Sequence, residues 1–206
     1  MFLVVEGPEG AGKSTLVRWL AARLQADGQD VVAVREPGGT PIAEAARKLA
    51  LKSRHDRAFA AELFLFLAAR ADLVERVIRP ALAAGKMVIA DRFGLSTIAY
   101  QVAGRGLERE DVEAALRIAT GGLVPDLTLV LDVAVNIGRE RQRGAGKVSD
   151  RIEREDDAFH NRVREAYRCA IGPGIAHIDA SQSKKSVQEA AWREVMGGAS
   201  TLRGVS

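Results

Sequence analysis

The 206-residue chain has a single cysteine, Cys169, so it cannot form an internal disulfide. Its densest apolar run, residues 63–69, is far shorter than the ~18 residues that span a bilayer. The first residues lack the basic segment of a secretory signal peptide. These absences exclude a disulfide-stapled fold and predict a cytoplasmic protein that has no membrane span.

The chain also lacks repeats, low-complexity tracts and a strong charge of one sign. Its formal net charge is +3, and 47% of its residues are hydrophobic. Residues 139–154 contain six basic and three acidic residues, so the positive excess is concentrated in this segment. A focal positive segment favours a small polyanion over nucleic acid as the ligand, and a solvated helix face is the alternative.

Short apolar runs alternate with longer helical patterns along the chain, and the runs lack the strict alternation of half-exposed strands. The predicted strands are 1–6, 31–35, 87–91, 127–132 and 175–179, and the predicted helices are 13–27, 40–51, 57–84, 95–103, 108–120, 135–143, 153–171 and 182–196. This order predicts an α/β fold with a parallel sheet that binds ligands beyond the carboxyl ends of its strands. We expect one domain over 1–196 and a flexible tail over 197–206.

Residues 7–14 match the pattern G-x-x-x-x-G-K-S, directly between the first predicted strand and the first predicted helix. Glycines let successive backbone N–H groups point at phosphate oxygens, and the helix start adds its positive dipole end. Lys13 would reach the outer phosphates, and the Ser14 hydroxyl would ligate Mg²⁺. The motif predicts a nucleotide site, and a glycine-rich turn at a helix start is the alternative.

A magnesium-binding loop also needs a carboxylate at a neighbouring strand end, and two are available. Asp91 ends one apolar run and precedes Arg92, whereas Asp132 ends another run. We favour Asp91, because an adjacent arginine suits phosphoryl transfer, and we expect Asp132 to cap the helix that follows it. The alternative for Asp91 is a structural cap or a partner for Arg92.

A second site is indicated by Phe66 and Arg70, which lie one turn apart within an apolar stripe at helical spacing. A guanidinium in such a stripe needs a partner, and an aromatic face beside its donors suits a nucleobase. The alternatives are a core position for Phe66, and for Arg70 a path to solvent or a carboxylate partner.

Further polar residues follow the Asp-Arg pair. Ser96 and Tyr100 would share one helix face, and Thr97 and Gln101 would share the adjacent face. Hydroxyls and an amide just beyond a strand end suit the polar edge of a base or sugar, and an ordinary polar helix start is the alternative. Together with the aromatic–arginine pair they predict a second binding site, which a nucleotide-driven switch does not need.

In their order along the chain, these segments resemble the bacterial thymidylate kinases from Met1 to about Asp179. The resemblance rests on VEGPEGAGKS (5–14), REPGGT (35–40), FLAAR (66–70), DRF (91–93), ST (96–97), AYQ (99–101), PDLT (125–128) and DRIE (150–153). The first segment is common to many nucleotide-binding proteins, whereas the REPGG run and the ordered set are specific to this family.

The resemblance implies a three-layer P-loop kinase fold, with a five-stranded parallel sheet flanked by helices and a mobile lid over about 143–153. It implies phosphorylation of dTMP to dTDP by ATP with Mg²⁺, in a homodimer that binds neither nucleic acid nor a membrane. The alternatives are a kinase for dUMP or a modified analogue, and a P-loop NTPase switch.

The resemblance also implies roles for single residues. Glu9 would contact the sugar 3′-hydroxyl, Phe66 would stack on thymine and Arg70 would donate to its O4. Arg92 would hold the acceptor phosphate. Arg151 of the lid would close on the transferred phosphates, because Gly10 stands where the family's other subclass has a catalytic arginine.

The predicted site residues fall into four groups. The catalytic residues are Glu9, Lys13, Arg92 and Arg151. The ATP-binding residues are Gly7, Pro8, Glu9, Gly10, Ala11, Gly12, Lys13, Ser14, Thr15 and Arg141, which would pack against adenine. The substrate-binding residues are Glu9, Arg35, Pro37, Arg47, Phe66, Arg70, Arg92, Ser96, Thr97, Tyr100 and Gln101, and the metal-binding residues are Ser14 and Asp91.

Overall fold

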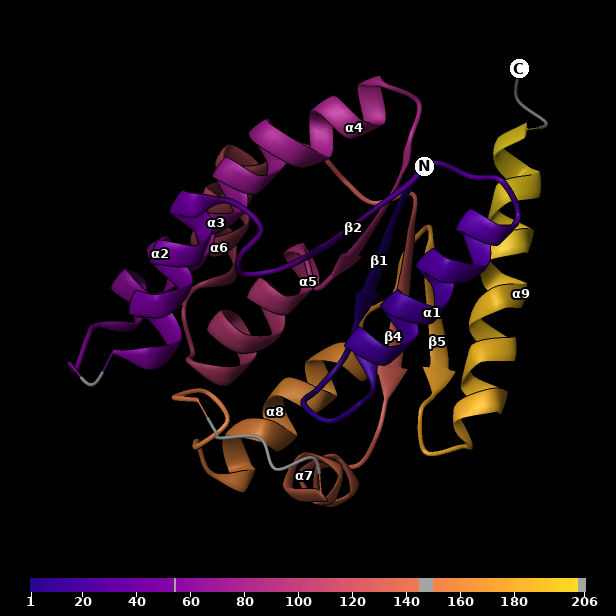
Figure 1. Cartoon of the computed structure of the whole chain (residues 1–206). Coiled ribbons are helices and arrows are strands. Elements are labelled where there is room, and N and C mark those ends of the chain that lie inside the picture. The colour runs from indigo at the N-terminus through magenta and orange to yellow at the C-terminus, as the bar shows by residue number, and fades with distance from the viewer. Residues whose placement is uncertain (54, 145–149, 204–206) are drawn as a thin grey trace.

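The computed structural model describes residues 1–53, 55–144 and 150–203 (Figure 1). Within it, five parallel strands form a sheet in the order β2-β3-β1-β4-β5. The strands are β1 (Phe2–Glu6), β2 (Val31–Arg35), β3 (Met87–Asp91), β4 (Leu127–Asp132) and β5 (Ile175–Asp179). Four have the bounds predicted from the sequence, and β1 begins one residue later than predicted. The predicted α/β class and parallel sheet are confirmed.

The register of the sheet aligns the carboxyl ends of the strands. Asp91 of β3 pairs with Val5 of β1 and with Arg35 of β2, and Asp132 of β4 pairs with Asp179 of β5. Because all the strands run in one direction, the segments that follow them emerge at the same edge. This edge carries the phosphate-binding loop and the Asp-Arg pair.

Helices cover both faces of the sheet, as the three-layer prediction requires. They are α1 (Lys13–Ala26), α2 (Pro41–Arg47), η1 (Lys48–Lys52), α3 (Phe59–Leu73), η2 (Val74–Ile78), α4 (Arg79–Ala83), α5 (Gly94–Thr97), η3 (Ile98–Gly104), α6 (Arg109–Thr120), α7 (Val135–Gly144), α8 (Asp157–Arg168) and α9 (Lys184–Arg203), of which η1–η3 are π-helical. Leu3 and Val5 of β1 pack in one buried cluster with α1 and α9, and Phe2 and Val4 pack in another with η2 and α4. Figure 1 shows α1 and α9 on one side of the sheet and α3, α4 and α6 on the other.

Three of the predicted helices contain π-helical turns that the hydrophobic periodicity does not indicate. The helix predicted over 57–84 is α3, then η2, then α4, and Pro80 lies in the first turn of α4. Proline has no N–H to donate, and its ring clashes with the carbonyl one turn earlier in a regular α-helix. The wider turn of η2 accommodates Pro80, so that the helical segment continues through it.

Two helix ends also differ from the prediction by four residues or more. The helix predicted from residue 153 begins at Asp157, because the Asp156 carboxylate accepts a hydrogen bond of 2.7 Å from the Phe159 N–H and caps it. Helix α9 runs to Arg203, into the predicted tail, where no proline interrupts it. The flexibility of this tail stays a prediction.

The predicted lid is described only at its two ends. Residues 145–149, which include Gly146 and Lys147, lie outside the described residues, as do 204–206. Among the helices that are described, none combines the length and the apolar character needed to cross a membrane.

A pair of glycines lets α7 pack directly against the phosphate-binding loop. A Cβ on Gly138 of α7 would lie 2.3 Å from the carbonyl oxygen of Glu9. A Cβ on Gly10, whose φ is 71°, would lie 2.1 Å from the carbonyl oxygen of Gly138. Because α7 leads into the lid, this contact joins the base of the lid to the loop.

We predict that Gly138→Ala destabilises the protein, because the added methyl group forces the loop and α7 apart. Overpacking of this kind costs about 1–3 kcal/mol, which lowers the melting temperature by several degrees in a chain of this size. The control is Gly197→Ala in α9, where a Cβ would meet nothing within 4 Å. Thermal unfolding of both variants tests the prediction, and an unchanged melting temperature for Gly138→Ala contradicts it.

Candidate active site

A cavity of about 470 Å³ lies at the carboxyl edge of the sheet. Its lining includes most of the residues singled out in the sequence: Glu9, Gly10, Gly12, Lys13, Ser14, Thr15, Arg35, Pro37, Arg47, Phe66, Arg70, Asp91, Arg92, Ser96, Thr97, Tyr100, Gln101 and Arg141. The lining thus joins the phosphate-binding loop to the residues expected at a second site. Gly7, Pro8, Ala11 and Arg151 are predicted site residues that do not line this cavity.

Lys13 is the first residue of α1, and its side chain folds back over the phosphate-binding loop. Its ammonium donates to the carbonyl oxygens of Gly7 at 2.9 Å and Pro8 at 2.7 Å. Burial, followed by the nearby positive charge of Arg92, lowers the pKa of Lys13 from 10.5 to about 8. A buried ammonium held only by neutral carbonyls is a strong binding point for an anion such as phosphate.

Ser14 and Asp91 meet where α1 begins and β3 ends. The Ser14 hydroxyl donates a short hydrogen bond to Oδ2 of Asp91, and both side chains line the cavity. Asp132, the other strand-end carboxylate, instead accepts hydrogen bonds from Nε of Arg164 at 2.7 Å and from its Nη2 at 3.0 Å. The structure therefore supports the choice of Asp91 for the cavity and corrects the expectation that Asp132 serves as a helix cap.

Arg92 is held at the centre of the cavity wall by its backbone and its side chain. Among the described residues it is the only non-glycine residue with positive φ, at 77°. Such a conformation costs about 1–3 kcal/mol, and it persists only where the surrounding structure enforces it. Its N–H donates to the carbonyl oxygen of Val5 on β1, which fixes the turn after β3.

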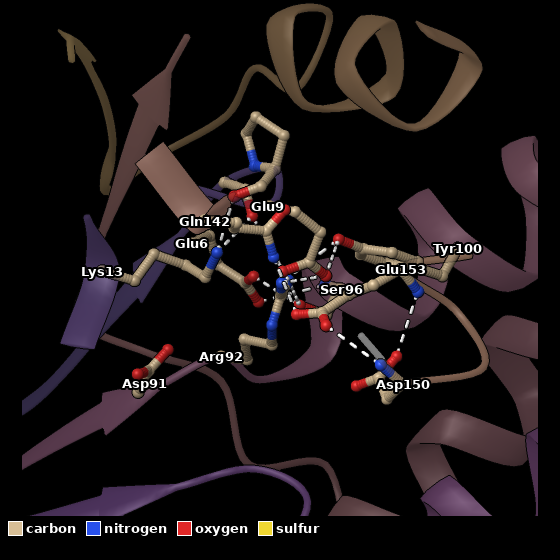
Figure 2. A network of polar contacts seen from close by, with 12 residues as sticks. Glu6, Glu9, Lys13, Asp91, Arg92, Ser96, Tyr100, Gln142, Asp150 and Glu153 are labelled. Atoms are coloured by element: carbon tan, nitrogen blue, oxygen red, sulfur yellow. Dashed lines mark hydrogen bonds and ion pairs between the residues drawn. The ribbon is translucent and has the colours of Figure 1, made fainter. Parts of the chain in front are cut away.

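The Arg92 guanidinium binds oxygen atoms from four different elements. Its Nη2 donates to Oε1 of Glu9 at 2.8 Å and to the Tyr100 hydroxyl at 3.1 Å, and its Nη1 donates to the hydroxyls of Ser96 at 3.1 Å and Tyr167 at 3.0 Å. Figure 2 shows Glu9, Ser96 and Tyr100 gathered around it. Burial opposes the charge, but Glu9 and the two tyrosines outweigh this effect and raise the pKa of Arg92 further.

The predicted faces of helix 95–103 are confirmed by these contacts. Ser96 and Tyr100 both point toward Arg92, whereas Thr97 accepts from Arg70. Gln101 is buried and lines the cavity, and its Nε2 has no hydrogen-bond partner among the described residues. Its unpaired donor is therefore available to a ligand.

Glu6 stabilises this arrangement through its hydrogen bonds. The sequence analysis does not single this residue out. It is the last residue of β1 and is fully buried. Its carboxylate accepts from the backbone N–H groups of Phe93 at 2.8 Å and Ser96 at 3.0 Å, and from the hydroxyls of Ser96 at 2.6 Å and Tyr167 at 3.1 Å. One carboxylate thus caps α5 and holds two of the hydroxyls that contact the Arg92 guanidinium.

Arg70 lines the same cavity as the phosphate-binding loop and is 4% exposed. It donates to Oε2 of Glu36 from Nε at 2.7 Å, to Thr97 Oγ1 at 2.5 Å and to the Phe93 carbonyl oxygen at 2.9 Å. Of the alternatives for this residue, pairing with a carboxylate is confirmed. Phe66, one turn earlier on α3, is half-buried and contributes its side chain to the same cavity.

Two more arginines line the cavity near Pro37. Arg35 and Arg47 both donate to the Pro37 carbonyl oxygen, at 3.3 and 2.8 Å, and Arg35 also pairs with Glu44 at 2.8 Å. Burial, and then the charge of Arg35, lower the pKa of Arg47. Two guanidinium groups on one carbonyl leave excess positive charge, which favours an anionic ligand at this end of the cavity.

Arg141 before the lid and Arg151 within it line two different pockets. Arg141 of α7 lines the cavity and donates to the Ala180 carbonyl oxygen at 2.9 Å. Arg151 instead lies in a smaller pocket with Arg154 and faces Asp56 at 3.6 Å. The structure therefore does not bring Arg151 together with the other predicted catalytic residues.

Several cavity residues were not predicted. Leu51, Ile152, Asp150 and Glu153 line the cavity, and Figure 2 shows both acidic residues beside the Arg92 network. Asp150 and Glu153 accept hydrogen bonds from each other's backbone N–H groups, at 3.0 and 3.1 Å. The spacing S/D-x-x-E, which the segment DRIE contains, is the signal of such a reciprocal cap.

The part of the chain that the structure describes contains no cluster of three or more metal-binding side chains. Mg²⁺ does not require such a cluster, because it keeps several waters and binds one or two protein oxygens together with substrate phosphates. The Ser14 hydroxyl and the Asp91 carboxylate, which lie in contact beside the phosphate-binding loop, are donors of the kind that fit this ion.

Known proteins with similar sequences cover nearly the whole chain. Residues 5–191 match the family model for thymidylate kinase. A thymidylate kinase of Pseudomonas putida (strain GB-1) is 49% identical over 193 residues, which cover 91% of each chain. One of Cereibacter sphaeroides is 51% identical over 196 residues, covering 91% of this chain and 90% of the relative, and one of Halothermothrix orenii is 44% identical over 200 residues, covering 96% and 97%. With its cavity residues within the matched range, the chain belongs to the thymidylate kinase family.

Proposed function

We propose that this protein transfers the γ-phosphoryl group of ATP to dTMP, which gives ADP and dTDP. The observation that carries the proposal is a single cavity that joins a phosphate-binding loop, at Lys13, to an aromatic–arginine pair, Phe66 and Arg70, with Arg92 between them. The family membership supports the same reaction.

The donor nucleotide binds at the phosphate-binding loop. The ammonium of Lys13 exchanges its carbonyl partners for the outer phosphates, and the backbone N–H groups of the loop surround them. Arg141, which lines the cavity, packs against the adenine ring. Ser14 and Asp91 would hold Mg²⁺, which would neutralise part of the charge on the donor phosphates.

The acceptor nucleotide binds between Arg92 and the base site. Arg92 holds the 5′-phosphate, while Arg35 and Arg47 add positive charge, and Glu9 meets the sugar 3′-hydroxyl. Phe66 stacks on the thymine ring, and Arg70 donates to its O4. Thr97 and Gln101 lie beside the base, and Pro37 lines the site near Arg35 and Arg47.

The chemistry is a direct in-line transfer. A 5′-phosphate oxygen of dTMP bonds to the γ-phosphorus as the bond from that phosphorus to the β–γ bridging oxygen breaks, and ADP leaves. The protein forms no covalent bond, so positioning and charge neutralisation lower the barrier. Arg151 reaches the transferred group only after the lid moves, because its own position is outside the cavity.

One alternative, the P-loop switch, differs from this proposal at the second site, whereas the other shares that site. A P-loop switch has no use for an aromatic–arginine pair in the nucleotide cavity. A kinase for dUMP or a modified analogue would use the same O4 donor, and dTMP is favoured by the family membership. Cytosine carries an amino group at this position, which would face the Arg70 donors and leave them unpaired.

We also propose that the protein is a homodimer that associates through α2, η1 and α3. Ile42, Leu49 and Phe64 on these adjacent elements are 57%, 55% and 61% exposed. Large exposed apolar side chains on neighbouring elements suit a protein–protein contact surface. Figure 1 shows α2 and α3 side by side, away from α1 and α9.

The function is tested by incubating the protein with ATP, Mg²⁺ and single nucleoside monophosphates. We expect ADP formation that depends on dTMP, a rate with dCMP that is lower by at least two orders of magnitude, and loss of most turnover in Lys13→Ala. ADP release that is independent of any monophosphate indicates a switch instead. A near wild-type rate for Lys13→Ala contradicts the mechanism.

For the lid, we predict that Arg151→Ala lowers kcat by about 10²-fold or more, as removal of a transition-state charge contact does. The KM for dTMP should change much less, because Arg92 and the base site hold this substrate. Steady-state kinetics measure both constants. A wild-type kcat with a raised KM for dTMP would place Arg151 at the acceptor and refute the lid assignment.

For the dimer, we predict that Phe64→Glu converts the protein to a monomer, because a charge in an apolar interface is not solvated. The control is Ile171→Glu between α8 and β5, where the side chain is 87% exposed. Light scattering coupled to size-exclusion chromatography measures the mass. A monomeric wild type, or a Phe64→Glu variant that stays dimeric, contradicts the proposed surface.

A further inference from the structure

Glu36 forms part of the cavity wall between β2 and α2, but it takes no part in the roles described above. It directly follows β2 and is 7% exposed. Its backbone N–H donates to the Asp91 carbonyl oxygen at 3.0 Å, which continues the pairing of β2 with β3 by one residue. The side chain is therefore fixed at its base and extends toward Arg70.

The Glu36 carboxylate makes its hydrogen bonds through one oxygen. Its Oε2 accepts from Nε of Arg70 at 2.7 Å and lies 2.5 Å from Nη2, and both side chains are 4% exposed. Its Oε1 has no hydrogen-bond partner among the described residues. Within this part of the chain, the polar contacts of the Glu36 side chain are all with Arg70.

Most of the N–H donors of Arg70 already have an acceptor in the protein. A guanidinium has five N–H groups in a rigid plane. Nε and Nη2 face Glu36, Nη2 also donates to the Phe93 carbonyl oxygen, and Nη1 donates to Thr97. This pattern fixes the plane of the group on three sides and leaves one hydrogen of Nη1 for a ligand.

Among the three partners of Arg70, Glu36 contributes most to the stability of its buried charge. Thr97 and the Phe93 carbonyl are neutral, so Glu36 supplies the negative charge that makes burial of the guanidinium tolerable. Without Glu36, the free energy of the charged guanidinium is lower when it turns toward solvent in the open cavity. Its remaining N–H would then no longer point at a base.

We infer that Glu36 is a positioning residue for base recognition, which fixes Arg70 so that a single Nη1 hydrogen meets a base carbonyl. This inference rests on the proposed reaction with dTMP. It assigns the selectivity of the base site to an ion pair rather than to Arg70 alone. A buried, pre-oriented donor discriminates strongly against a base with an amino group at that position, whereas a mobile arginine adapts to it.

The test is a double-mutant cycle of Glu36→Ala and Arg70→Ala, with kcat and KM measured for dTMP, dCMP and ATP. Glu36→Ala should raise the KM for dTMP by about 10-fold and lower the preference for dTMP over dCMP by a similar factor. The kcat with dTMP and the KM for ATP should stay within about threefold of wild type. In the Arg70→Ala background, Glu36→Ala should have no further effect on the KM for dTMP.

Two further variants separate positioning from folding. Glu36→Gln keeps the volume and an oxygen that accepts from Nε, so it should restore part of the affinity for dTMP. Glu113→Ala removes the carboxylate of an exposed Arg–Glu pair on α6 and should leave every constant unchanged.

The outcomes distinguish the inference from the proposed function. If the wild type does not form ADP with dTMP, the proposed function fails. If the wild type is active, three results overturn the role of Glu36: unchanged constants in Glu36→Ala, an equal effect in the Arg70→Ala background, or a parallel rise in the KM for ATP.

Discussion

The guanidinium of Arg92, whose side chain is 15% exposed, is the constraint on which the rest of the site depends. A charge at this depth is tolerated only if oxygen atoms surround it, and here they come from the phosphate-binding loop, η3, α5 and α8. Glu6 then holds Ser96 and Tyr167 in place from the end of β1. One arginine at a strand end therefore binds residues 83 positions before it and 75 positions after it along the chain.

The other buried cations of the cavity are balanced in different ways, and the difference suits their proposed tasks. Arg70 has a carboxylate partner of its own, so it is held rigidly as a hydrogen-bond donor. Among the described residues Lys13 donates to two carbonyl oxygens, and burial, followed by the charge of Arg92, lowers its pKa to about 8. Its charge is best compensated when phosphates bind. The cavity thus combines a fixed recognition group with an anion site.

The lid is coupled to the phosphate-binding loop through the close approach of Gly10 and Gly138. A side chain at residue 10 would displace α7, which explains in steric terms why the loop carries no arginine at this position. Positive charge lies instead in α7, where Arg141 lines the cavity, and in the lid, where Arg151 lines a second pocket.

The strands could be predicted from the sequence, because a parallel sheet covered on both faces produces apolar runs with sharp bounds. The phosphate-binding loop could be predicted as well, because its motif needs only local glycines and a helix start. The pairing of Phe66 with Arg70 in one cavity was also predictable, since both lie on one helix. Helical periodicity does not report the π-helical turns. The tertiary structure alone decided that Glu36 compensates Arg70, that Glu6 and Tyr167 hold the Arg92 network, and that Asp132 pairs with Arg164. These contacts join residues from 32 to 161 positions apart, and a buried charge selects its partner by proximity in space, which spacing along the chain does not encode.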